Sequence, residues 1–365
     1  RYKRENCRMI ISIFPRKDTT LYSAAVSESV NTGIDEILEI TKIISSSGTT
    51  QVTNTRILVD FDLDWISSSI QSGEISRSTA TPMDFYLNLF ATEAKNIPIE
   101  YHLAIAPVSE SWDMGVGRST NNPYVKEGAS WKYRDGENTA TRWNGNLDGC
   151  TTGSTFHSGS FVTKSYQETD DVRASVSKSV SIFFPGNQGF LVGRDPIEEN
   201  DSKRYGSLLY FSNETKTIYK PKLEVCWDDS VFSTGTMDPL DVQNKDITLY
   251  VDNNRGTYYS GSRSRFRVRG VEKYKAKTYG TSSQALVVEY LPSSSYYSLV
   301  DSKTQETVIP FDTKYTRVSC DSDGNFLDLW MEGLYPERLY ELRFKIVSGS
   351  SINYYEPNQP FKIIK

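Results

Sequence analysis

Residues 52–66 constrain the fold more than any other part of this chain. Their sequence is VTNTRILVDFDLDWI, and from Ile57 onward the side chains alternate in character. One predicted face carries Ile57, Val59, Phe61, Leu63 and Trp65, and the other carries Leu58, Asp60, Asp62 and Asp64. A period of two with β-branched and aromatic residues predicts a half-buried strand, with one face in a core and the other against water or a neighbour. A helix is excluded because the apolar positions do not recur every three and four residues.

The composition extends this prediction to the whole chain. Its 365 residues suggest two or three domains. Aromatic side chains make up 12% of the sequence, with 23 Tyr, 16 Phe and 6 Trp. Because aromatic and β-branched residues fit a pleated, half-buried surface, we expect an all-β protein.

The charge and the hydrophobic segments exclude some function classes. A formal net charge of −5 disfavours nucleic acid as a partner, since phosphate contacts need a basic surface. No run reaches the roughly 18 apolar residues that span a bilayer, so we expect no membrane segment. The short apolar run before Pro15 does not resemble an export signal. Residues 1–8 are basic and aperiodic, and we interpret them as an extension or a basic arm.

The cysteines do not form a metal-binding or disulfide pattern. They are widely spaced, without a C-x-x-C pair: Cys7, Cys150, Cys226 and Cys320. Structural zinc is therefore disfavoured, and we expect free thiols from a reducing compartment. We predict no metal ion and no cofactor.

Alternation and turn signals divide the chain into two parts. Residues 9–230 contain a series of alternating stretches, with a turn at residues 31–33 and one short predicted helix at residues 64–71. Residues 231–245 cluster Gly, Pro and acidic residues and form a predicted linker. Residues 246–365 place strands at short, regular intervals, which is the pattern of a second β-sandwich.

A long loop at residues 109–160 interrupts the first part. It is rich in Gly, Asn, Thr and Asp, and it contains Trp112, Trp131 and Trp143. A loop this long is typical of a functional or interface element. Two interpretations stay open: the indoles stack on sugar rings in a glycan site, or they anchor the loop onto the sandwich.

No catalytic constellation is recognisable. Neither His102 nor His157 lies in a triad-like setting, and we interpret His102 as a structural residue of a strand. The sequence contains no G-x-S-x-G elbow, no G-x-x-x-x-G-K loop and no strand–G-x-G-x-x-G–helix unit. We therefore expect a non-enzymatic protein.

Three aspartates form the one arrangement that resembles an ion site. Asp60, Asp62 and Asp64 share a predicted strand face, about 7 Å apart along it. They lack the loop order of an EF-hand, so a Ca²⁺ ion would need further oxygens from other loops. We favour a solvated face, with Asp62 as a cap for the following turn.

Residues 263–277, RSRFRVRGVEKYKAK, form a strongly basic stretch. Arg263, Arg265, Arg267 and Arg269 alternate along it. We interpret the stretch first as a charged edge strand that resists unwanted pairing, then as a docking edge for a protein partner, and last as a nucleic-acid site.

Several motifs resemble DNRLRE-type jelly-roll domains. They are FPRKDTTLYS with NTGIDEILEI, the strand TRILVDFDL, the loop PVSESWDMG, GASW, and RYGSLLYFSNETKTIYKPKLEVCW. The resemblance covers about residues 13–229 and implies a jelly roll over residues 9–230, with Arg56, Phe61 and Asp62 in its central signature. In the second part, LYPERLY resembles the corner of fibronectin type III-like domains. This resemblance implies an Ig-like or fibronectin-like sandwich in which Pro336 and Tyr340 have structural roles.

The jelly-roll resemblance is strongest toward virion proteins of tailed phages. It implies a structural component of the tail, baseplate, neck or capsid surface, made in the host cytoplasm and docked onto other virion proteins in many symmetric copies. The alternative from the Trp-containing loop is a carbohydrate-binding or adhesion module at a cell surface.

Overall fold

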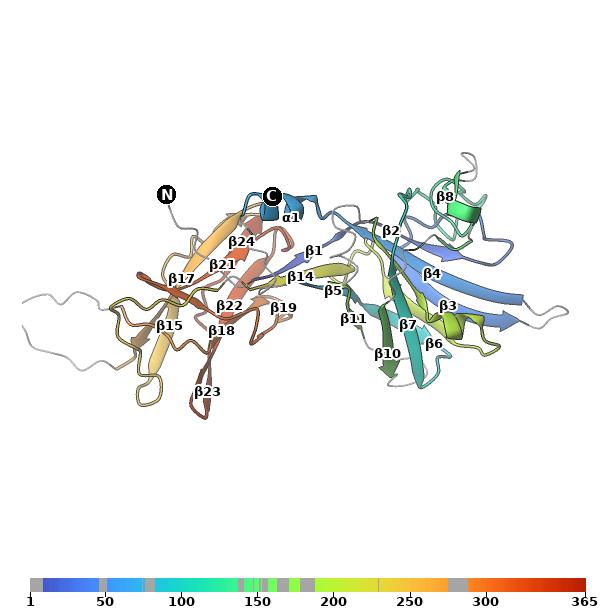
Figure 1. Cartoon of the computed structure of the whole chain (residues 1–365). Helices are drawn as coiled ribbons and strands as arrows, with labels where there is room; N and C mark the ends of the chain where they lie inside the picture. The colour runs from blue at the N-terminus through green and yellow to red at the C-terminus, as the bar shows by residue number, and fades with distance from the viewer. Residues whose placement is uncertain are drawn as a thin grey trace, which may run out of the picture. The chain divides into compact units, whose positions relative to one another are not determined.

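The computed structural model divides the chain into two compact units (Figure 1). Unit 2 comprises Ile13–Ser69 and Asp84–Glu224, and unit 1 takes the rest, mainly Val225–Lys365. The structure describes residues 9–45, 51–73, 75, 83–136, 141–146, 148–150, 152, 157–162, 171–177, 188–228, 230–274 and 288–365. This description leaves out three parts of the chain that were singled out above. They are residues 1–8 with Cys7, the side chain of His157, and residues 275–277 at the end of the basic stretch.

The fold is all-β, as the alternation predicted. Within the described ranges the helical elements are α1 (Asp64–Gln71), α3 (Pro196–Asn200) and a 3-10 turn (Asn144–Asn146). The helix predicted at residues 64–71 is thereby confirmed. Helix α3 begins because the Asp195 carboxylate accepts a hydrogen bond from the Ile197 amide and Pro196 occupies the first turn.

An antiparallel eight-stranded sheet forms most of unit 2. Its order is β10-β7-β12-β4-β3-β13-β6, with β2 paired to β4. The strands are β2 (Pro15–Tyr22), β3 (Ile37–Ser45), β4 (Gln51–Phe61), β6 (Ala91–Lys95), β7 (Glu100–Pro107), β10 (His157–Val162), β12 (Phe190–Arg194) and β13 (Gly206–Phe211). Strands β5 (Asp84–Leu89) and β11 (Val172–Ser175) form a further antiparallel ladder, and β8 (Tyr133–Asp135) pairs with β9 (Thr141–Arg142).

Strand β4 lies inside this sheet and pairs with β2, β3 and β12. Figure 1 shows it beside β2 and β3. Every residue from Ile57 to Phe61 is buried. The second face meets a neighbour and not water, because Leu58 and Asp60 are also fully covered, so the solvated-face interpretation is wrong for Asp60. The predicted core face is correct: Phe61 is buried and its ring lies 6.3 Å from that of Phe190.

Unit 1 contains two sheets. One has the order β15-β17-β21-β20, and the other has the order β16-β24-β22-β18-β19, with β23 paired to β22. Their strands are β15 (Ile247–Val251), β16 (Thr257–Tyr259), β17 (Arg263–Glu272), β18 (Ser295–Asp301), β19 (Thr307–Ile309), β20 (Ser319–Asp321), β21 (Gly324–Trp330), β22 (Leu339–Ser348), β23 (Ser351–Tyr355) and β24 (Phe361–Ile364). Aromatic rings from both sheets meet in the core, where Phe266 lies 5.2 Å from Phe361.

The remaining strands, β1 (Met9–Ile13) and β14 (Lys222–Trp227), each contain a point at which the chain passes from one unit to the other, and two further points lie in α1 and directly before β5. Residues 231–245, the predicted linker, belong to unit 1 and are partly packed there. Leu240 is buried, and its amide donates to the Tyr290 carbonyl at 2.9 Å.

Candidate functional site

A long loop covers one face of the main sheet of unit 2. Leu58 of β4 and Leu191 of β12 lie in a buried cluster with Trp112, Trp143 and Cys150, which all come from the loop. Burial of this face explains why the alternation in β4 does not mark a solvent-exposed side. The apolar cluster supplies the hydrophobic free energy that holds an otherwise polar loop in place.

The three loop tryptophans are anchors of different kinds. Trp112 and Trp143 are 4% and 1% exposed, and their indole N–H groups donate to the carbonyls of Gln188 and Ser130. Trp131 is half-buried, and the Arg56 guanidinium lies 4.8 Å from its ring centroid. A sugar cannot reach the buried rings of Trp112 and Trp143, so their stacking role is wrong and the anchoring role is correct.

The Asn31 side chain fixes the loop through hydrogen bonds to its backbone. Its side-chain amide donates to the carbonyls of Met114 and Ala129, at 2.8 and 2.9 Å. Its side-chain oxygen accepts from the amides of Gly33 and Gly117. A fully buried side chain thus uses two donors and two acceptor sites, which is the full capacity of an asparagine amide.

The packing around Asn31 requires glycine. A Cβ atom on Gly33 would lie 2.1 Å from the Met114 carbonyl oxygen. Gly128 has a φ of +96°, and a Cβ there would lie 2.5 Å from the Gly115 Cα. The loop backbone therefore approaches the residue 31–33 turn more closely than any other residue type allows.

The outer part of the loop, residues 116–124, is exposed but tied at its base. The Ile34 amide donates to the Gly117 carbonyl, and the Asn31 amide donates to the Val125 carbonyl. Val116, directly before the first tie, is 68% exposed, and Tyr124, directly before the second, is 53% exposed. The loop thus presents apolar side chains to solvent from a fixed base.

Beside the loop, Arg56 and Glu199 form a two-point ion pair. The Arg56 Nε and Nη2 atoms lie 2.8 and 2.7 Å from the two Glu199 carboxylate oxygens, and Nη1 donates to the Gly149 carbonyl. A hollow of about 200 Å³ adjoins this pair and the Cys150 thiol. Burial raises the pKa of Cys150, which keeps the thiol protonated and unreactive.

The three aspartates do not act together. Asp60 is buried, and its carboxylate accepts from Arg16 Nε at 2.7 Å, so the solvated-face interpretation is wrong for this residue. Asp62 is exposed and accepts from the Asp64 amide at 3.0 Å, which confirms its role as a cap at the start of α1. Within the described residues, no group of three or more His, Cys, Asp or Glu side chains is placed to hold a metal ion.

His102 is tied to helix α3. Its Nδ1 atom lies 2.8 Å from Glu198 Oε1, and this hydrogen bond raises its pKa. The structural interpretation of His102 is therefore correct.

The four alternating arginines of the basic stretch do not lie on an edge strand of their sheet. Strand β17 pairs with β15 on one side and with β21 on the other, so the edge-strand and docking-edge interpretations are wrong. Arg263 and Arg265 both bind Asp328 at 2.8 Å, Arg267 binds Asp321, and Arg269 binds Asp252 at 2.7 Å. We call these residues the arginine ladder. The sequence pattern missed it because its carboxylates come from other strands and turns.

Tyr340 forms the predicted corner. It is buried in β22, and its hydroxyl donates to the Tyr335 carbonyl at 3.2 Å, across the turn that contains Pro336. Burial raises the pKa of Tyr340 to about 12.

Comparisons with known proteins give little guidance. No family model matches the chain, and no curated protein matches it. Among solved structures, a DUF4785 family protein from Legionella pneumophila is 11% identical, with a TM-score of 0.19, and 99% of this chain aligns with 69% of that one. A β-D-glucuronidase from Dictyoglomus thermophilum is 7% identical, with a TM-score of 0.17, and 99% of this chain aligns with 45% of that one. TM-scores this low carry no argument about fold or function. Among the described helices, none is long and apolar enough to cross a membrane.

Proposed function

We propose that this chain is a non-enzymatic structural protein that docks onto other proteins of a multi-copy assembly, and that the assembly is a tailed-phage virion. The docking element is the outer part of the unit 2 loop, residues 116–124. The observation that carries the proposal is the combination of a rigid base around Asn31 with exposed Val116 and Tyr124.

A fixed loop suits docking because a preorganised surface loses little conformational entropy when a partner binds. Aromatic side chains in such a position are frequent binding hot spots. Each copy of the chain would present the same surface, which is the requirement for repeated contacts in a symmetric particle.

The chemistry beside the loop supports a non-enzymatic role. Arg56 and Glu199 satisfy each other, and His102 is engaged by Glu198. The Cys150 thiol is buried. Pairs of this kind stabilise a fold, which is the role that the proposal gives them.

The choice of a virion rests on the resemblance of the motifs in residues 13–229 to DNRLRE-type proteins of tailed phages. Mass spectrometry of purified particles from the source virus tests it. The chain should appear at a fixed ratio to the major capsid protein, and its absence from the particles would refute the assignment.

A variant pair tests the docking element. Val116→Asp with Tyr124→Ser should leave the melting temperature unchanged, because both side chains are exposed, but should abolish incorporation into particles. Ile352→Ser in unit 1 is a matched control, since it also removes an exposed apolar side chain. Normal incorporation of the double variant would rule out this loop as the docking element.

A further inference from the structure

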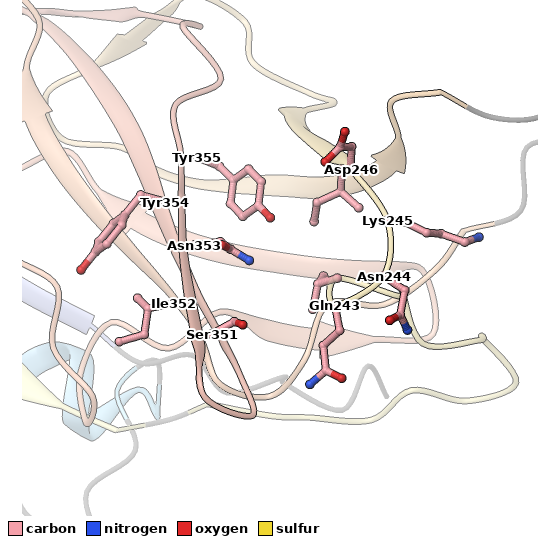
Figure 2. Close-up of a pocket in the computed structure, with 11 residues that line it drawn as sticks. Gln243, Asn244, Lys245, Asp246, Ser351, Ile352, Asn353, Tyr354 and Tyr355 are labelled. Carbon is pink, nitrogen blue, oxygen red and sulfur yellow. The ribbon is translucent and has the colours of Figure 1, made fainter.

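A polar hollow in unit 1 lies between residues 242–247 and strand β23 (Figure 2). We infer that this hollow is a binding site for a neutral saccharide. Its volume is about 610 Å³, within the range of ligand pockets in general. The proposal goes beyond the docking function, because it concerns a different unit and a different class of ligand.

The side chains of β23 divide between two sides. Figure 2 shows Asn353 and Tyr355 directed toward the segment that carries Gln243 and Asp246, whereas Ile352 and Tyr354 point the opposite way. This is the period of two expected for a strand. The hollow consequently receives the amide and the phenol of β23, and its apolar side chain faces elsewhere.

Tyr355, Asn353 and Asp246 form the polar centre of the hollow. Burial raises the pKa of the Tyr355 hydroxyl, and both the Asn353 side chain and the negative charge of Asp246 act on it. All three residues line the hollow. A hydroxyl, an amide and a carboxylate therefore lie close together. The Gln243 amide adds a further donor and acceptor to the opposite wall, where the Asn244 amide group donates to the Asp241 carboxylate.

The charges around the hollow disfavour other ligand classes. Lys245 points away from β23 in Figure 2, and its ammonium pairs with Glu272 at 3.1 Å. Asp246 is then the remaining formal charge, which repels phosphates and acidic sugars. A single carboxylate is too few for Ca²⁺, which takes six to eight oxygen ligands, roughly half of them charged in tight sites.

A neutral saccharide matches what remains. Each sugar hydroxyl both donates and accepts a hydrogen bond, and amide side chains do the same. A purely apolar ligand would leave the polar lining unsatisfied at a cost in free energy. The hollow also differs from the loop of unit 2, where the rings of Trp112 and Trp143 are buried.

The test uses the full chain with a glycan array of neutral, acidic and N-acetylated oligosaccharides, followed by NMR titration with the best neutral oligosaccharide up to about 10 mM, where weak polar binding is measurable. Asn353→Ala and Gln243→Ala should each weaken binding about fivefold, as expected for one lost hydrogen bond. Lys245→Ala is the matched control on the same segment and should bind as the wild type does. Melting temperatures of all variants should agree, because these side chains lie at the surface.

Three results would overturn the inference. They are the absence of binding by any neutral oligosaccharide, a preference for acidic glycans, and binding that is lost in Trp131→Ala but retained in Asn353→Ala. None of these results affects the docking proposal, whose test is particle incorporation.

Discussion

The two units cover the outer face of a sheet in different ways. In unit 2, the face formed by Leu58 and Leu191 lies under a long loop that is anchored by buried tryptophans and Asn31. In unit 1, the face of β17 and β21 has the arginine ladder, in which Arg265 and Arg267 lie over the buried ring of Phe326 at 4.0 and 5.1 Å. In unit 2, a few residues with many contacts supply most of the free energy that holds the loop. In unit 1, the stabilising free energy is divided among several ion pairs of the ladder.

Buried carboxyl groups show the same difference. Burial raises the pKa of Asp18 in unit 2 to about 7, because the backbone hydrogen bond from Asn213 compensates only part of the desolvation. Asp321 in the ladder is also desolvated, but its hydrogen bonds from Arg267 and the Asp323 amide, with the charges of Arg267 and Arg265, together outweigh burial and lower its pKa. We therefore expect single substitutions at a few positions of unit 2 to reduce stability strongly, and single substitutions in the arginine ladder of unit 1 to reduce it less.

The largest expected effect is that of Asn31→Ala. It removes four hydrogen bonds and leaves buried backbone groups unpaired, so the free energy of unfolding should fall by about 5 kcal/mol. Urea denaturation followed by tryptophan fluorescence measures this loss. Thr120→Ala, at an exposed position of the same loop, should change stability by less than about 0.5 kcal/mol. Equal losses for the two variants would contradict the role of Asn31.

Trp143→Ala should cost about 4 kcal/mol, because it opens a cavity under the loop and removes the hydrogen bond to Ser130. Tyr124→Ala removes a large ring from the exposed part of the loop and serves as its control. Thermal denaturation of both variants provides the comparison. A loop that merely rests on the sheet would lose far less stability from Trp143→Ala.

The pH dependence separates the two kinds of carboxyl group. The pKa of Asp18 is higher in the folded state than its ordinary value near 3.8, so its stabilising contribution is complete below about pH 4 and is lost as the pH rises through 7. Asp18→Asn should remove this loss, which is at most about 4 kcal/mol. Urea denaturation at pH 5 and pH 8 should give a smaller difference for the variant than for the wild type. An unchanged difference would show that Asp18 is ionised at both pH values in the folded chain.

In the arginine ladder, Asp328→Asn should cost about 2 kcal/mol, because two arginines lose their charged partner. Asp323→Asn is the control, since its carboxylate is 77% exposed and lies 3.7 Å from Arg267. The loss of stability caused by Asp328→Asn should be smaller in high salt, because salt screens the ion pairs of the ladder and reduces their contribution. A loss as large as that of Asn31→Ala would refute the distributed model.

The smallest expected effect is that of Tyr340→Phe, which keeps the ring and removes only the hydrogen bond to the Tyr335 carbonyl. Stability should fall by about 1 kcal/mol. Calorimetry of the variant tests this, with Tyr259→Phe as a control at a 65% exposed position.

Local sequence patterns predicted what depends on local structure. Alternation identified the core face of β4, and Asp62 caps the turn that follows it, as predicted. The turn at residues 31–33 was recognised, but the reach of Asn31 to residues 83 and 98 positions away was not visible.

The sequence did not reveal which strands and loops lie next to a given strand. The alternating arginines of β17 resembled an exposed edge, because a sequence does not reveal which strands flank it or where Asp252 and Asp328 lie. Likewise, the pattern assigned Leu58 to a face of β4 but did not show what covers that face, since the covering loop comes from residues more than 50 positions later. Tertiary pairing decided both cases.

Hydrogen exchange on the isolated full chain tests the central claim most directly, namely that the unit 2 loop is fixed before any partner binds. The amides of Asn31, Gly117 and Ala129, which donate into the loop's hydrogen-bond network, should be protected nearly as well as those of β4. Rapid exchange of these amides, with protection confined to the strands, would show that the loop orders only on docking and would contradict a preformed docking surface.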